Sequence, residues 1–110
     1  MPVQHNIAPP LTHVEEERLF DLISACRGEQ GGQFNRNRPA QRHNRRRLFT
    51  AIDEPNRATW RAASGIYLLE KGEVITFGEA VKKHTDSASG ETPTREQMFA
   101  TLEILARFRP

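Results

Sequence analysis

Residues 12–26 read THVEEERLFDLISAC and decide the fold class. Thr12 and Glu15 have the spacing of a capping box, in which the hydroxyl accepts a backbone N–H bond and the carboxylate reaches back to the threonine N–H. The apolar residues then recur at the i, i+3, i+4, i+7 spacing of one helical face: Leu19, Leu22, Ile23 and Cys26. The stretch predicts an amphipathic helix over 13–27, with Gly28 just past its end.

Comparable signals predict four more helices, over residues 40–52, 55–71, 77–84 and 94–107. Helix 55–71 is expected to be the most buried, because apolar side chains cover most of its circumference, and Gly72 would end it. Thr76 and Glu79 form a second capping box, and Thr92-Pro93 is typical of a cap followed by a first-turn proline.

The expected fold class is all-α, a compact bundle of four to five helices. Residues 74–76 are β-branched and allow one very short strand, although no partner strand is evident.

The chain of 110 residues is long enough for one domain with one hydrophobic core. Residues 1–11 contain three prolines and no periodicity, which indicates an extended N-terminal arm. The rest, residues 12–110, is expected to be a single helical domain. Residues 28–39 are rich in Gly, Asn and Arg and are expected to form a mobile loop within it.

Composition points to a cytoplasmic protein. The longest uncharged apolar run, Ile66 to Leu69, is far shorter than the roughly 20 residues of a membrane span, so no membrane partner is expected. Residues 1–10 lack the charged and apolar regions of a secretory signal. Cys26 is the single cysteine, which excludes an internal disulfide and fits a reducing compartment.

Positive charge is concentrated in one quarter of the chain. The formal net charge is only +2, but residues 36–61 hold eight arginines against two acids. The segments on either side, residues 1–35 and 62–110, are both net acidic. Such local asymmetry is informative about partners and not about the fold.

The arginine cluster is the strongest chemical signal. Arginine binds phosphate in a bidentate manner and stacks on bases, and basic clusters bind nucleic acid with release of counterions. The cluster predicts binding of DNA or RNA. The candidate nucleic-acid-binding residues are Arg36, Arg38, Arg42, Arg45, Arg46 and Arg47, extended by Arg57 and Arg61 one helical turn apart.

Two other interpretations of the cluster stay open. Arginine outnumbers lysine 13 to 3 in the whole chain, so the cluster could simply be solvated or paired within the molecule. It could also dock, together with Phe34, on an acidic or nucleic-acid-binding surface of a host protein, as an interaction module or inhibitor. Homodimerisation through the last helix fits either function. The small size and the lack of a housekeeping motif favour a regulatory or accessory protein of a phage or mobile element.

Catalytic chemistry is not expected. The four histidines are scattered, and none has a Cys, Asp or Glu at metal-ligand spacing. We therefore expect no catalytic residue, no metal site, no cofactor and no enzymatic activity. Trp60 is flanked by arginines and could stack a base, but a single Trp on a broad apolar stripe more often belongs to the core.

The last third of the chain resembles a winged-helix core in the order of its elements, a short strand followed by two helices. That resemblance would make Thr94, Arg95 and Gln97 the start of a recognition helix. The connection over 85–93 is longer than the usual turn of about three to four residues.

Overall fold

The computed structural model describes residues 8–26, 39–87 and 90–107, except for the side chains of residues 39 and 40. Five helices and one β-hairpin follow each other along these residues. Their bounds are α1 His13–Ala25, α2 Pro39–Asp53, α3 Arg57–Ser64, β1 Tyr67–Glu70, β2 Glu73–Thr76, α4 Phe77–His84 and α5 Arg95–Ala106. The predicted helical bundle is confirmed, with a pair of short strands in place of the single strand that the sequence allowed.

Side-chain caps fix where the helices begin. The predicted capping boxes at Thr12 and Thr76 are confirmed. The cap of α5 is Thr94, whose hydroxyl accepts from Gln97 N at 3.1 Å, so the prediction of a cap at Thr92 is wrong by two residues. Thr94 and Gln97 form a capping box as well, because Gln at this spacing can accept the threonine N–H bond as Glu does.

The predicted helix over 55–71 is wrong in its second half. Helix α3 ends at Ser64, Gly65 caps it, and the chain continues as strand β1. Strand β1 pairs with β2 in antiparallel register, with Leu68 opposite Ile75 and Glu70 opposite Glu73. The apolar residues after Gly65 therefore have the two-residue period of a strand, with Leu68 buried and Tyr67 exposed. Helix α3 is also not the most buried element, since Ala63 is its one fully buried residue.

A two-residue turn, Lys71-Gly72, joins the strands. Both residues have positive φ, 51° and 82°, as a type I′ hairpin turn requires. Glycine adopts this conformation without the steric cost that a Cβ brings. Gly72 thus closes a hairpin and does not end a helix.

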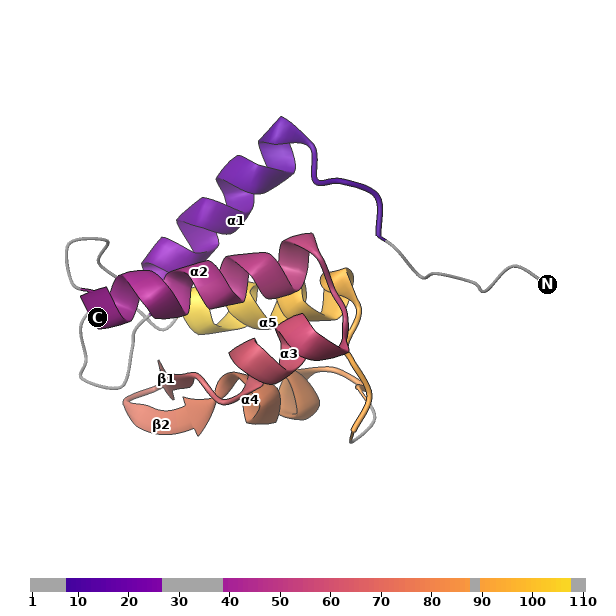
Figure 1. Ribbon diagram of the computed structural model, residues 1–110. Coiled ribbons are helices and arrows are strands. Elements are labelled where there is room, and N and C mark those ends of the chain that lie inside the picture. The colour runs from indigo at the N-terminus through magenta and orange to yellow at the C-terminus, as the bar shows by residue number, and fades with distance from the viewer. Residues whose placement is uncertain (1–7, 27–38, 88–89, 108–110) are drawn as a thin grey trace.

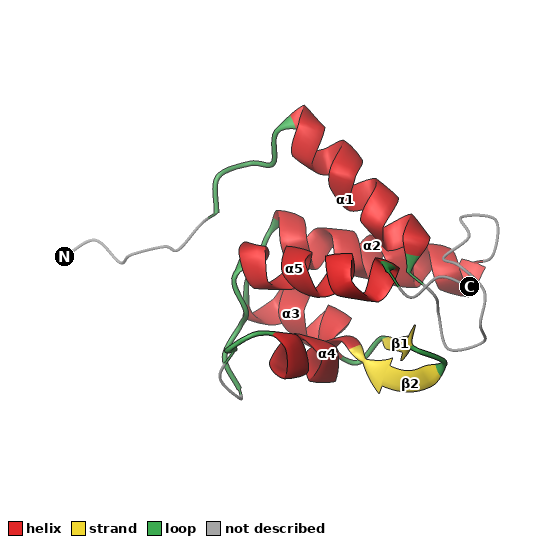
Figure 2. Cartoon of the chain, turned by 180° about the vertical axis from the view of Figure 1, so that it is seen from behind, coloured by secondary structure: helices red, strands yellow, loops and turns green. Residues whose placement is uncertain are grey.

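Helix α5 lies at the centre of the fold and contacts α1, α2 and α4. Figure 1 shows α2 and α3 in front of α5, and Figure 2, from behind, shows α5 in front. The largest fully buried side chains come from all parts of the described chain and include Leu19, Ile23, Leu48, Ile52, Leu68, Phe77, Met98 and Leu102. The apolar stripe of α5 is used inside the protomer and is not left as a surface for a second copy.

Some predictions concern residues outside the described ones, namely residues 1–7 of the predicted arm, residue 27 of the first predicted helix and residues 28–38 of the predicted loop. Pro39, the last residue of that predicted loop, begins α2 instead. Leu11, at the end of the predicted arm, is buried in the core. None of the described helices is long and apolar enough to cross a membrane.

Candidate polyanion-binding face

Six of the eight predicted arginines belong to the described residues, while Arg36 and Arg38 do not. Helix α2 carries Arg42, Arg45, Arg46 and Arg47, and α3 carries Arg57 and Arg61. The structure divides these six into two groups, because Arg45 and Arg47 contact neighbouring helices and the other four side chains are exposed.

Helix α2 is held in place by the apolar residues of its second half. Leu48, Ala51 and Ile52 are fully buried. At 3.6 residues per turn, Arg46 is on the side of the helix opposite Leu48, and Arg42 lies one turn before it. Both arginines are exposed. The core thus anchors the helix in an orientation that turns these two guanidinium groups to the solvent.

Arg47 connects α2 with α3. Its Nη1 donates to the backbone oxygen of Ala62 at 3.2 Å, and its Nη2 donates to the Asn44 side chain. Its Nε is buried and has no hydrogen-bond partner among the described residues. We therefore assign Arg47 to the contact between α2 and α3 and not to the residues that would bind a ligand.

Arg45 connects α2 with α1 in a different way. Its guanidinium carbon lies 4.3 Å from the centre of the Phe20 ring, within the range of a cation–π contact. Arg45 and Arg47 project from opposite flanks of α2, one toward α1 and the other toward α3. Arg42 and Arg46 are exposed, whereas Arg45 is half-buried beside Phe20.

Arg57 and Arg61 are exposed on α3, one helical turn apart. Helix α3 starts at a capping box in which Asn56 accepts from Thr59 N and Thr59 accepts from Asn56 N. Arg47 ties Ala62 of α3 to α2, and both helices lie on the near side in Figure 1. We call Arg42, Arg46, Arg57 and Arg61 the basic face.

Two acids of α1, Glu15 and Glu17, have partners within α1 or its cap. Glu15 caps α1, and the hydrogen bond from the Thr12 backbone lowers the pKa of its carboxyl. Glu17 pairs with His13 at 2.9 Å, and Arg18 pairs with Glu103 of α5. Within the described part of the chain, none of the four arginines of the basic face forms an ion pair.

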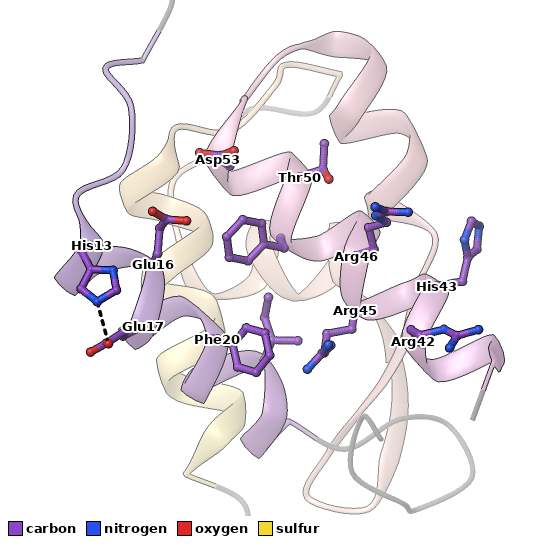
Figure 3. Close-up of a pocket in the computed structure, with 12 residues that line it drawn as sticks. His13, Glu16, Glu17, Phe20, Arg42, His43, Arg45, Arg46, Thr50 and Asp53 are labelled. Carbon is purple, nitrogen blue, oxygen red and sulfur yellow. Dashed lines mark ion pairs between the residues drawn. The ribbon is translucent and has the colours of Figure 1, made fainter. Parts of the chain in front are cut away.

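An open groove of about 1020 Å³ runs between α1 and α2 beside the basic face. Phe20, Ile23 and Phe49 give it an apolar middle. Figure 3 shows Glu16, Glu17 and Asp53 toward one end and Arg42, Arg45 and Arg46 toward the other. This groove was not predicted from the sequence. Its one sequence signal is Phe20, a large apolar residue at the edge of the apolar stripe of α1.

Trp60 and Cys26 both pack in or against the core. The Trp60 ring packs on Phe77, with ring centres 5.5 Å apart, as expected for a core tryptophan. Cys26 is buried, and its thiol lies 3.9 Å from the backbone oxygen of Leu102.

The winged-helix interpretation required an exposed start of α5. Arg95 is buried instead, and it donates through Nε to Ile52 O at 2.9 Å and through Nη2 to Asp53 O at 2.8 Å. Thr94 and Gln97 are occupied in the cap of α5. Arg95 thus holds the C-terminal end of α2, and the three residues are not arranged to lead a recognition helix.

Metal ligation has no support among residues 8–26, 39–87 and 90–107, where no three or more His, Cys, Asp or Glu side chains are grouped to hold an ion. Comparisons of the chain with protein-family models, with curated proteins and with solved structures give no match.

Proposed function

We propose that the protein binds nucleic acid through the basic face, with Arg42 and Arg46 from α2 and Arg57 and Arg61 from α3 contacting phosphates. The observation that carries the proposal is that these four guanidinium groups are exposed on two adjacent helices and form no ion pair within the described residues. Each of them keeps its donors available for a phosphate, which arginine binds in a bidentate manner.

Rigidity of the scaffold supports the same function. The basic face stands on helices that the core and the Arg47 contact hold in place, so little ordering is needed when a ligand binds. Preorganised groups lose less entropy on binding than groups on a disordered tail. Like-charged groups so close together repel each other, and a phosphate backbone would remove that repulsion.

The biological setting that we infer is a cytoplasmic regulatory or accessory role, with a phage or mobile element as the source. Small size and the absence of a catalytic motif fit such a role. Arg36 and Arg38 would add phosphate contacts next to the start of α2.

The test compares two variants that each lose four positive charges. In the first, Arg42, Arg46, Arg57 and Arg61 are all replaced by Gln, and we call it the four-arginine variant. In the matched control, four exposed cations from other places are replaced by Gln: Arg18, Lys71, Lys82 and Arg107.

Fluorescence anisotropy with labelled DNA and RNA, both duplex and single-stranded, measures binding. We expect the four-arginine variant to lose affinity by about 100-fold at moderate salt, since each lost phosphate contact removes one counterion-release contribution. The control should stay within a few-fold of the unmodified protein. Equal losses in both variants would mean that only net charge matters and would refute the basic face.

A protein partner is the second candidate function, in which the protein is an interaction module or an inhibitor. The apolar middle and the charged ends of the groove favour it, because a nucleic-acid backbone would not use Phe20 and Phe49. Co-purification from a nuclease-treated host lysate separates the two. A protein partner retained after digestion supports this candidate, and loss of every partner supports nucleic acid.

A further inference from the structure

The groove between α1 and α2 has opposite charges at its two ends. Helices α1 and α2 run in roughly opposite directions; the end of α1 lies near the start of α2, and the helices diverge toward the start of α1 and the end of α2 (Figure 1). Glu16 and Glu17 come from the start of α1 and Asp53 from the end of α2. The arginines come from the first half of α2. The charge therefore changes sign along the groove, from acidic to basic.

The middle of the groove is apolar and partly exposed. Phe20 is 37% exposed although it belongs to a helix that faces the core, and Phe49 is half-buried. Ile23 forms the floor below them. Apolar area of this kind, between charged ends, is typical of the centre of a protein interface with a polar rim.

A surface whose charge reverses from end to end is complementary to itself after a half-turn. A twofold axis through the middle of the groove brings the acidic end of one copy against the basic end of the other, twice. Such an isologous contact is the commonest form of homodimer. We propose that the partner for this groove is a second copy of the same chain.

The surface is small for a protein–protein interface. The 13 residues of α1 span about 20 Å, and two helices side by side are about 20 Å wide, so each copy would bury on the order of 400 Å². The total of roughly 800 Å² lies below the range of stable interfaces and in that of transient ones. We expect a weak dimer that forms at high protein concentration and dissociates as salt screens the charged ends.

Dimerisation would occupy part of the basic face. Arg57 and Arg61 lie on α3, on the opposite flank of α2 from the groove, and would remain exposed in both copies. Arg42 and Arg46 belong to the basic face and also line the groove, so in the dimer these two arginines would face the acidic end of the second copy. The inference does not depend on nucleic-acid binding, and its test uses nuclease-treated protein alone.

The test is a charge-reversal experiment with two variants. In one, Glu16 and Glu17 are replaced by Arg, which makes both ends of the groove basic. In the other, Arg42 and Arg46 are replaced by Glu, which adds acid to the basic end. The altered side chains are exposed, and circular dichroism verifies that each variant is folded.

Sedimentation velocity measures self-association from low micromolar to near-millimolar concentration. Each variant alone should associate at least 10-fold more weakly than the unmodified protein, because ends of like charge then meet. An equimolar mixture of the two should form a heterodimer with an affinity within a few-fold of the original homodimer, because opposite charges meet again at both ends.

A matched control reverses two exposed acids away from the groove, Glu73 and Glu91, to Arg. It should dimerise like the unmodified protein. The proposal is overturned if the unmodified protein stays monomeric over the whole concentration range at low salt, or if the mixture of variants fails to associate. Dimerisation that survives both reversals would also overturn it, because the contact would then lie elsewhere.

Discussion

Two charged regions of this molecule differ in whether their charged side chains form ion pairs. Where the hairpin meets α4, Glu70 is buried and its carboxylate accepts from both Lys83 and His84. On the basic face, four arginines stand on two helices without an ion pair in the described residues. The first region uses its charges to hold a strand against a helix. In the second region the arginine side chains are exposed to solvent, where a ligand could contact them.

The same contrast divides the arginines. Arg95 and Arg47 donate to backbone carbonyls of neighbouring helices and so belong to the scaffold. Arg42 and Arg46 do not. Removing a scaffold charge should therefore change stability, whereas removing a charge of the basic face should change binding.

The largest effect on stability is expected for Arg95→Ala. Arg95 is only 8% exposed and holds two carbonyls at the end of α2, and hydrogen bonds from charged donors contribute about 1.5 to 3 kcal/mol each. We expect the free energy of unfolding to fall by about 3 kcal/mol in urea denaturation. Arg57→Ala, on the exposed side of α3, is the control and should change it by less than about 0.5 kcal/mol. Equal losses of stability in Arg95→Ala and Arg57→Ala would contradict the division into scaffold arginines and arginines of the basic face.

A smaller loss is expected for Glu70→Gln. The amide keeps the shape of the side chain but removes the charge that Lys83 and His84 share. Lys83 is largely exposed, so its part of the interaction is screened, and we expect a loss of about 1 to 2 kcal/mol. Thermal and urea denaturation measure it. Glu73→Gln, on the exposed partner position of the hairpin, should be neutral.

The Glu70 contribution should depend on pH. Burial alone raises the pKa of this carboxyl, but the hydrogen bonds and charges of Lys83 and His84 outweigh it and lower the pKa below its ordinary value of 4.5. A pKa that is lower in the folded state adds stability above the unfolded-state pKa, and this stability is lost as the pH falls through the folded-state pKa. The difference between the unmodified protein and Glu70→Gln should shrink as the pH falls below about 4.5. A difference that grows on acidification would contradict this assignment.

The Arg45–Phe20 contact is expected to be weaker still. Cation–π contacts at exposed sites contribute about 0.5 to 1 kcal/mol. A double-mutant cycle of Arg45→Ala and Phe20→Ala should give a coupling energy of this size. A coupling near zero would mean that α1 is held on α2 by its buried residues alone.

The smallest change in stability is expected for the four-arginine variant. These side chains hold no other part of the described structure, and their loss relieves repulsion between like charges. The free energy of unfolding should change by less than about 0.5 kcal/mol, in either direction. A marked loss would show that the basic face belongs to the scaffold.

The sequence predicted helices best where both a cap and a periodic apolar face were present. Helices α1 and α4 were placed within two residues at each end. The hairpin was missed because its turn is Lys71-Gly72, without the Asn-Gly or Asp-Gly pair that usually marks such turns, and because Leu68 and Leu69 fit a helical face as well as a strand.

The arginines show what a sequence pattern cannot decide. Twelve residues of basic sequence look uniform, yet Arg46 is exposed and Arg47, its neighbour, bonds to Ala62. The difference is a rotation of 100° around the axis of α2, and its meaning depends on which helix lies on that flank. Ala62 is 15 positions from Arg47 along the chain, and only the fold shows that it lies on this flank of α2. Arg95 is a further case, since its partners are more than forty positions away.

The salt dependence of nucleic-acid affinity tests the central claim most directly. The logarithm of the binding constant of duplex DNA is measured against the logarithm of salt concentration for the unmodified protein, the four-arginine variant and its matched control. Each phosphate contact adds about 0.9 to the steepness of this line, so the four-arginine variant should be shallower by about 3.6 while the control keeps the original slope. An equal slope in all three proteins would contradict the assignment of phosphate binding to Arg42, Arg46, Arg57 and Arg61.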